Sequence, residues 1–307
     1  MGYVASFLIM HLNRMALYAK HTPMTIQPIQ IMFENSNTRE YKAHIPKNTG
    51  GDLILNMYLK NIDISNIERV DVSIRGEIIQ SFTGEYIALK LNLETSTQKI
   101  AAITNSRYVP IPCPKYIPVY DDLNVTVVTR TLQTVDIRLY IDFLFFLLEP
   151  QKGDILFQQV QVASTVLAPN TTTTKLYTRF KHLIKEFYIV VQGSSDWLDF
   201  TTGSSVIKSI MIEFDGSIKV DQSAMYFSKI QPLDYHTCVP KTPSAFFTYS
   251  FALDPESELP TGHVNMGMIK NQTITLRHAS SDVPMRITVY AIGYNVLSGD
   301  DGKLVFT

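Results

Sequence analysis

Paired acidic side chains are the residues of this sequence with the clearest potential for chemistry. Two carboxylates held close together can act as general acid and base, or can bind a calcium ion. Such pairs occur at Asp121-Asp122, Glu213-x-Asp215, Asp254-Pro255-Glu256-x-Glu258 and Asp300-Asp301. Most of them lie in turn-like segments, where Asp is favoured because its side chain caps backbone N–H groups. We therefore expect solvated turns, with a calcium site or an acid–base pair as the alternatives.

Histidine and cysteine show no spacing that is typical of metal binding or nucleophilic catalysis. The seven histidines are scattered over His11, His21, His44, His182, His236, His263 and His278. Cys113 and Cys238 are the only two cysteines, fewer than a disulfide-stapled protein usually carries, so two free thiols are expected. One disulfide or a shared metal are the alternatives. The sequence also lacks the zinc-protease, serine-hydrolase and phosphate-binding motifs. We predict that the chain is not an enzyme and needs no cofactor or metal.

Positive charge is local rather than global. The net charge is −1 over 307 residues, which provides no general field for holding nucleic acid. Between Lys175 and Lys185, Arg179, Lys181 and His182 alternate with apolar residues. This segment predicts the solvated face of a strand or helix, or alternatively a patch for an acidic partner. Trp197 is interpreted as a core or subunit-contact anchor, with a base-stacking platform as the alternative.

Short β-branched and aromatic segments make up most of the chain. We predict strands at residues 54–59, 70–74, 125–128 and 137–141, separated by turn signals at 48–51, 75–76, 120–122 and 151–154. The apolar run Phe143–Leu148 exceeds strict alternation and predicts a segment buried on both sides between the two sandwiches, with a wholly internal strand or a subunit contact as the alternatives. Many short strands with few helices indicate an all-β chain of sandwiches.

The first residues have a different pattern. Between residues 3 and 19, apolar side chains recur at three- and four-residue steps, which predicts a short N-terminal helix. It would pack on its own domain, or form an arm that contacts a neighbour or a membrane surface. The segment is a poor signal peptide, and no run approaches the roughly 18 apolar residues that span a bilayer.

The two halves of the chain resemble each other. Residues 70–78 and 210–218 share three alternating apolar positions, followed by Gly76 in the first half and Gly216 in the second. Tyr86 and Tyr226 match at the same offset as these glycines, and Ile137-x-Leu139-Tyr140 parallels Ile287-x-Val289-Tyr290. Ordered matches of this kind indicate a duplicated domain. We predict an arm over residues 1–23 and two similar domains over 24–150 and 151–307.

A long motif in the second half consists of Tyr249, Ser250, Phe251, Ala252, Leu253, Pro255, Glu256, Pro260, Gly262 and Asn265. It resembles a signature of the major capsid proteins of nucleocytoplasmic large DNA viruses. In that family a Tyr-Ser-Phe-Ala-Leu strand precedes a Pro-Glu turn, a Pro-x-Gly and an Asn. His263, Val264 and Met266 depart from the commoner residues. Residues 51–59, 158–161, 226–227, 231–232 and 294–299 also resemble family segments, so the likeness covers nearly the whole chain.

The resemblance implies a double jelly roll, made of two tandem eight-stranded antiparallel sandwiches, that forms homotrimeric, pseudo-hexagonal capsomers of an icosahedral virion shell. It implies assembly in the host cytoplasm or nucleus, with minor capsid, penton or cement proteins as further partners. The N-terminal helix would lie near an internal membrane. At 307 residues the chain is short for the family, whose members are usually much longer, so its outer loops should be short. The alternatives are a scaffold that shapes an immature virion, and a carbohydrate-binding or glycan-cleaving double sandwich.

Overall fold

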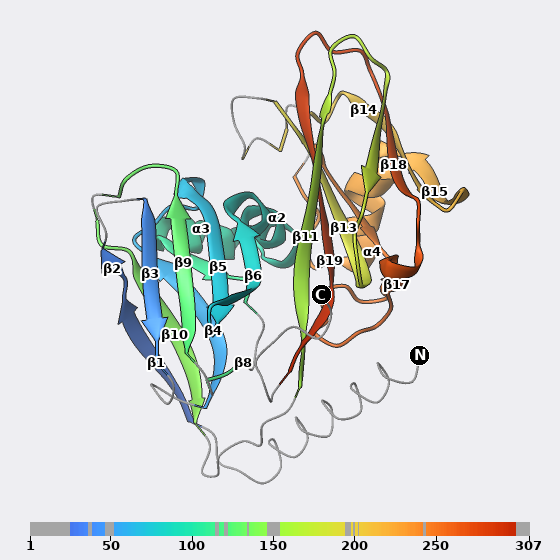
Figure 1. The fold of residues 1–307 in the computed structure, drawn as a ribbon. Helices are drawn as coiled ribbons and strands as arrows, with labels where there is room; N and C mark the ends of the chain where they lie inside the picture. Colours follow the sequence, from blue (N-terminus) through green and yellow to red (C-terminus); the bar gives the residue numbers. More distant parts are fainter. Residues whose placement is uncertain are drawn as a thin grey trace. The chain divides into compact units, whose positions relative to one another are not determined.

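The chain forms two compact, mainly β units in the computed structural model (Figure 1). The structure describes residues 25–35, 39–46, 52–113, 117–119, 122–133, 135–145, 154–193, 198, 200–201, 203–241 and 244–298. Within them, the first unit takes in residues 25–87, 98–159 and 295–298, and the second takes in 88–97 and 160–294. The predicted N-terminal helix and Trp197 lie outside the described residues.

Two antiparallel sheets form the first unit. One has the strand order β1-β10-β4-β7, with β8 also paired to β4. The other has the order β2-β3-β9-β5-β6. The bounds are β1 Thr25–Met32, β10 Arg138–Phe145, β4 Leu53–Lys60, β7 Tyr108–Ile111, β8 Ile117–Pro118, β2 Glu34–Asn35, β3 Glu40–Ile45, β9 Leu123–Thr129, β5 Ile67–Ile74 and β6 Glu77–Thr83. The predicted strands at 54–59, 70–74 and 125–128 are therefore confirmed. The strand predicted at 137–141 is also present, but it begins at Arg138.

The second unit repeats this arrangement. Its sheets have the orders β11-β19-β13-β16, with β17 paired to β13, and β12-β18-β14-β15. The bounds are β11 Ile155–Leu167, β19 Met285–Leu297, β13 Leu183–Gln192, β16 Phe246–Ser250, β17 Val264–Asn265, β12 Thr173–Thr178, β18 Gln272–His278, β14 Ile207–Phe214 and β15 Ser217–Ser223. The beginning of β11, up to Gln159, is counted with the first unit. When the strands of each unit are counted in chain order, with the short extra strands left aside, strands of the same number occupy the same position in the two pairs of sheets.

Alternation and continuous hydrophobicity both contribute to the cores. Strand β9 alternates buried and partly buried positions along its whole length, as a strand with one face on the core does. Strand β13 is buried at nearly every position, which requires cover on both faces. The core of the second unit draws on both of its sheets, with Phe187, Ile212, Ile274 and Val289 among its members. Each pair of sheets therefore encloses side chains from both layers.

Helices connect several strands at places where the sequence pattern predicts none. Helix α2 spans Gly84–Glu94 and α3 spans Thr97–Ser106, between β6 and β7. In the second unit, a helical run of η2 (Tyr226–Ile230) and α4 (Gln231–Tyr235) follows β15. Short 3-10 turns lie at Ile64–Asn66 and Met266–Met268. Helix α2 is apolar at most positions around its axis, so no single stripe marked it as a helix.

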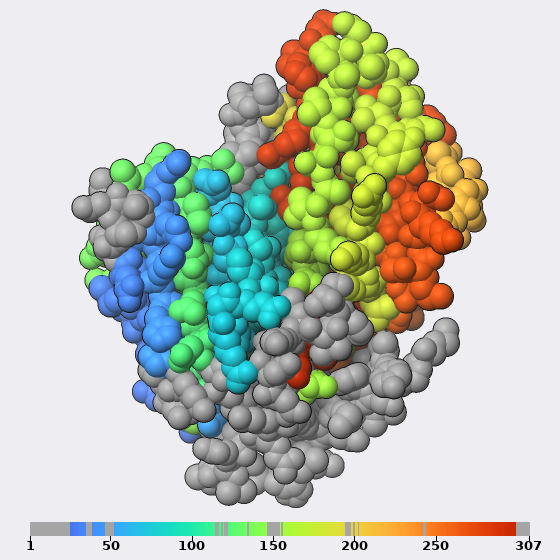
Figure 2. Space-filling model, viewed as in Figure 1, coloured from blue at the N-terminus to red at the C-terminus, as the bar shows by residue number. Residues whose placement is uncertain are grey.

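Some large apolar side chains are exposed on the surface of the second unit. Val162, Val166 and Tyr177 of β11 and β12 are among them. Figure 2 shows the β11–β12 segment in light green on the visible face of this unit, and the β5–β6 segment in cyan on that of the first. None of the helices in the described part of the chain is long and apolar enough to cross a membrane.

Candidate functional site

The repeat-defining residues lie at equivalent hairpins in the two units. Gly76 follows Arg75 in the turn between β5 and β6, and Gly216 follows Asp215 in the turn between β14 and β15. All four residues have positive φ, between 48° and 84°, which is typical of tight hairpin turns. Each hairpin also shifts register at the equivalent place, between Val72 and Ser73 and between Ile212 and Glu213.

The equivalence continues into the helices that follow the hairpins. The backbone N–H of Tyr86 donates to Oγ1 of Thr83 at 3.1 Å, and that of Tyr226 donates to Oγ of Ser223 at 3.4 Å. A hydroxyl that accepts from an N–H three residues later caps a helix start. Both tyrosines therefore lie in the first turn of a helical segment that is capped in the same way, at the offset that also separates the two hairpin glycines.

The family-motif residues form the end of β16 and the loop after it. Tyr249 and Ser250 are the last residues of β16, and Phe251 continues it by donating its N–H to the carbonyl of Lys185 at 2.7 Å. Ala252 and Pro255 are buried, whereas Leu253 is exposed. Pro260 is partly buried. The loop then returns to β13 through β17, where Asn265 pairs with Leu183.

Two residues of the motif shape this return. Gly262 has φ of +157°, and a Cβ there would lie 2.8 Å from the Phe251 carbonyl oxygen, so only glycine fits the close approach. Asn265 Oδ1 accepts the N–H of Gly267 at 3.1 Å and caps the short 3-10 turn that follows. Within the loop, Asp254 Oδ1 accepts the N–H groups of Glu256 and Ser257, each at 3.1 Å.

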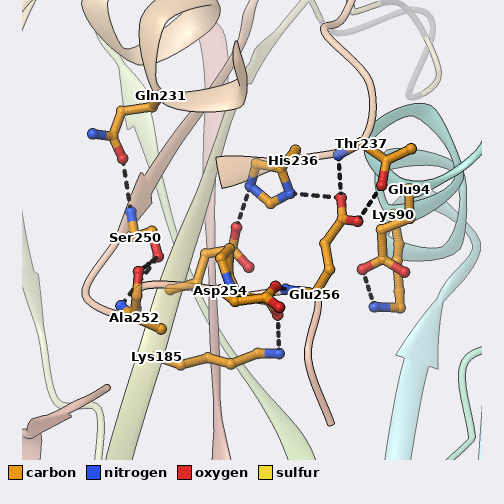
Figure 3. Close-up of polar contacts among 12 residues, drawn as sticks. Lys90, Glu94, Lys185, Gln231, His236, Thr237, Ser250, Ala252, Asp254 and Glu256 are labelled. Carbon is orange, nitrogen blue, oxygen red and sulfur yellow. Dashed lines mark hydrogen bonds and ion pairs between the residues drawn. The ribbon is translucent and has the colours of Figure 1, made fainter. Parts of the chain in front are cut away.

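A charged cluster includes Glu256 of the motif loop (Figure 3). His236, just after α4, lies between two carboxylates. Its Nε2 is 2.6 Å from Oε1 of Glu186 on β13, and its Nδ1 is 3.2 Å from Oε1 of Glu256 in the loop. The contact with Glu186 combines opposite charges with a short N···O separation, and both hold the imidazole in place. The side chains of His236 and Glu186 are each 1% exposed.

Glu256 is also held by the chain next to His236. The Thr237 N–H donates to Glu256 Oε1 at 2.7 Å, and the Thr237 hydroxyl donates to Oε2. These contacts join the loop to the segment after α4. Burial by itself would raise the pKa of Glu256, but the bonds from His236 and Thr237 outweigh burial and lower the pKa. Glu256 is thus an ionised carboxylate at neutral pH.

Lys185 is the second cation of the cluster. It belongs to β13, is almost fully buried, and donates from Nζ to the carbonyl oxygen of Pro255. Burial lowers the pKa of Lys185, as does the charge of Lys90, and three carboxylates partly oppose them, leaving a pKa of about 8. Figure 3 shows Lys90 and Glu94 of α2 beside the cluster, where they form an ion pair. Residues 88–97 belong to the second unit.

The electrostatics keep His236 charged. Burial by itself would lower the pKa of His236, but Glu186 and Glu256 outweigh it and raise the pKa to about 9. A histidine between two carboxylates resembles an acid–base site, yet the side chains at its centre have almost no contact with solvent. Among the described residues, no group of three His, Cys, Asp or Glu side chains is placed to hold a metal ion. The arrangement fastens the motif loop to β13 and α4.

The acidic turns and the cysteines are as the sequence predicts, whereas the basic segment and His236 differ from the prediction. Asp254 caps N–H groups as expected, and so does Asp215, which accepts those of Lys270 and Asn271 at 3.1 and 2.8 Å. Cys113 and Cys238 are free thiols. The basic segment is not wholly a solvated face, because Lys185 is buried where the outer side of β13 is covered. The ion pairs of His236 were missed, since its partners are distant from it in sequence.

A family model described as "Large eukaryotic DNA virus major capsid protein" matches residues 147–305, just over half of the chain. Among curated relatives, the major capsid protein of Pyramimonas orientalis virus is 22% identical, over 92% of this chain and 89% of its own length. That of Phaeocystis pouchetii virus is 37% identical over 81 residues, which is 25% of this chain and 15% of the relative.

Solved structures share the fold. A chain of the PBCV-1 virus capsid matches with a TM-score of 0.79 and 17% identity, covering 94% of this chain and 98% of its own. The Faustovirus major capsid protein matches with a TM-score of 0.73 and 9% identity, covering 91% of each chain. At these identities the likeness concerns the fold, and it extends over both units.

Proposed function

Because the chain belongs to the family of large eukaryotic DNA virus major capsid proteins, we propose that three copies form one pseudo-hexagonal capsomer of an icosahedral shell. Membership makes the chain a structural component of the virion capsid and not an enzyme. The observation that carries the trimer proposal is the common strand order of the two units.

In each unit, one sheet joins strands of rank one, eight, three and six, and the other joins those of rank two, seven, four and five, when short extra strands are left aside. This connectivity supports two eight-stranded jelly rolls, with domains at 24–150 and 151–307 and an arm at 1–23. The residues Gly76, Tyr86, Gly216 and Tyr226 would then mark the repeat, and the motif from Tyr249 to Asn265 would fix the second jelly roll.

Two similar sandwiches in a chain explain why a trimer suits a shell. Three copies bring together six similar units, and a ring of six presents nearly equivalent edges to its neighbours. Such blocks tile a curved surface by repeating one set of contacts. The contacts within a capsomer are expected to be larger and more apolar than those between capsomers, because capsomers are permanent.

Further partners follow from this role. Minor capsid, penton or cement proteins would join the capsomers, and the N-terminal segment would contact an internal membrane. Assembly would take place in the host cytoplasm or nucleus. The net charge of −1 supports a shell protein that binds no specific nucleic acid sequence.

The rival within the same fold is a transient scaffold that shapes an immature virion. Quantitative mass spectrometry of purified mature particles separates the two roles. A permanent shell protein would be among the most abundant chains in mature particles. A scaffold would be abundant in immature particles and absent from mature ones, which would contradict the proposal.

A further inference from the structure

The helices that follow the two equivalent hairpins differ in how they are covered. Leu93, near the end of α2, is fully buried in the second unit, where its carbonyl oxygen accepts the N–H of Cys238 at 2.7 Å. Leu233 occupies the equivalent position in α4, at the offset that separates Tyr86 from Tyr226, and is 66% exposed. Two leucines at equivalent positions of the repeat therefore differ, because Leu93 is buried and Leu233 is exposed.

The open helix has an apolar side. Met225, Ile230 and Leu233 are exposed large apolar residues on the helical run that begins after β15 and ends at Tyr235. At the same offset they are equivalent to Glu85, Lys90 and Leu93. A cluster of exposed apolar side chains beside polar ones, such as Asp234, is typical of a protein–protein contact.

The surface of β13 near Lys90 and Glu94 of α2 has an equivalent surface on β4 of the first unit. In the second unit, Lys90 and Glu94 lie near Lys185, which sits at an irregularity of β13 where the pairing with β19 skips one residue (Figure 3). In the first unit, the pairing of β4 with β10 skips Leu55 in the same way. Three residues further along, Tyr58 pairs with Tyr140 in the first unit and Tyr188 pairs with Tyr290 in the second. Leu55 of β4 is therefore the structural equivalent of Lys185 of β13.

The equivalent faces of β13 and β4 differ in how far they are buried. Glu186 and Tyr188 of β13 are buried, whereas Asn56 and Tyr58 of β4 are partly exposed. Tyr108 and Tyr140 beside them are also partly exposed, and the ammonium of Lys60 lies over their rings at 5.0 and 5.7 Å. The first unit thus presents an open aromatic face where the second unit has a covered one.

The charges change together on the helix and on the strand. Lys90 of α2 lies near the charged pair Lys185 and Glu186. At the equivalent positions the helix has Ile230, and the strand has Leu55 and Asn56. The helix and the strand therefore lose charge together at the equivalents of Lys90, Lys185 and Glu186, while Asp234 keeps the charge of Glu94. The apolar helix side with Ile230 and Leu233 remains for the uncharged strand positions Leu55 and Asn56. This complementarity identifies the first unit of a second copy as the occupant.

We propose that the helical segment Ala224–Tyr235 of one copy docks on the outer face of β4 in the next copy, with Ile230 and Leu233 against Leu55, Asn56 and Tyr58. The contact is heterologous, since different surfaces of the two copies meet, and three such contacts close a ring. The inference rests on the proposed trimer and names the surfaces that hold it together.

The first test replaces Leu233 with aspartate. Leu233→Asp should fold, because the side chain is exposed in the single chain, and circular dichroism melting checks this. Light scattering should show loss of at least nine-tenths of the trimer in favour of monomer. Leu253→Asp is the matched control, since Leu253 is 82% exposed in the same unit but outside the segment, and it should stay trimeric. A Leu233→Asp variant that stays trimeric would overturn the inference.

The second test examines the receiving face in the wild-type protein. Hydrogen exchange should be slower in the trimer than in the Leu233→Asp monomer at residues 53–60 and 224–235. Ile230→Lys and Leu55→Glu should each dissociate the trimer, and the double variant should regain it through an ion pair. Equal exchange at residues 53–60 would place the contact elsewhere. A wild-type protein that is itself monomeric would instead refute the trimer proposal.

Discussion

His236 and Glu186 form an ion pair, with Nε2 and Oε1 2.6 Å apart, inside the second unit. Glu186 lies on the central strand β13, and His236 follows the short helix α4. Glu256 on the other side of the imidazole belongs to the motif loop. One buried cation therefore connects a strand, a helix end and a loop that are far apart in sequence. The stability of this unit should depend on that cation more than on any surface ion pair.

Replacing His236 with leucine should destabilise the second unit by about 3–5 kcal/mol, because Glu186 would keep a buried charge without its partner. The measurement is the free energy of unfolding from chemical denaturation at pH 7. The double variant Glu186→Gln/His236→Leu should recover much of the loss, since it removes both charges. A loss below about 1 kcal/mol in the single variant would show that the pair contributes little.

The same pair predicts a dependence of stability on pH. The pKa of His236 is about 9 in the folded chain against an ordinary value of 6.5, so the folded state binds more protons between these values. Its stabilisation should be complete below about pH 6.5 and lost as the pH rises through 9. The melting temperature of the wild type should fall over this window relative to that of Glu186→Gln/His236→Leu. Parallel curves for the two proteins would contradict the assignment.

The contribution of Lys185 to stability should change with pH in the opposite direction to that of His236. Its pKa of about 8 lies below the usual 10.5, so the folded state binds fewer protons than the unfolded state between these values. Stability should therefore rise with pH in this window. Lys185→Met should be as stable as the wild type or about 1–3 kcal/mol more stable at pH 7, with the advantage disappearing above about pH 10. A clear loss at pH 7 would mean that the bond to Pro255 outweighs burial of the charge.

Gly262 should tolerate substitution less well than Gly216. Gly262→Ala would bring Cβ within 2.8 Å of the Phe251 carbonyl oxygen and 3.0 Å of Ala252 Cα, with strained backbone, and should cost about 3 kcal/mol. Gly216→Ala meets no atom within 4 Å and should cost about 1 kcal/mol for its positive φ alone. Unfolding of the two variants side by side checks the ranking, and equal losses would contradict the close approach.

The sequence predicted the strands well where side chains alternate. Residues 70–74 and 125–127 alternate apolar and polar, and both segments lie in strands whose apolar side chains are buried. The hairpin glycines were found for a related reason, because a tight turn with positive φ restricts residue type. Helix α2 was missed because it is apolar on most sides and is buried accordingly, so its periodicity resembles that of a buried strand.

The charged cluster could not be predicted from spacing. Lys185 and Glu186 lie in a strand whose other residues are mostly apolar, and His236 and Glu256 come from separate connections. Only the fold brings them together. The motif from Tyr249 to Asn265 was identified by resemblance, without a physical reason for Pro255 or Glu256. In the structure, the Pro255 carbonyl accepts from Lys185 and Glu256 holds His236, which explains why this turn follows the strand.

The solution mass of the wild-type protein tests the central claim most directly. We would measure it by multi-angle light scattering after size exclusion and examine the same sample by negative-stain electron microscopy. A stable species of about three times the 34.8 kDa chain mass, with a hexagonal outline, is the predicted result. A monomer at all accessible concentrations, with no tendency to assemble, would contradict the capsomer proposal.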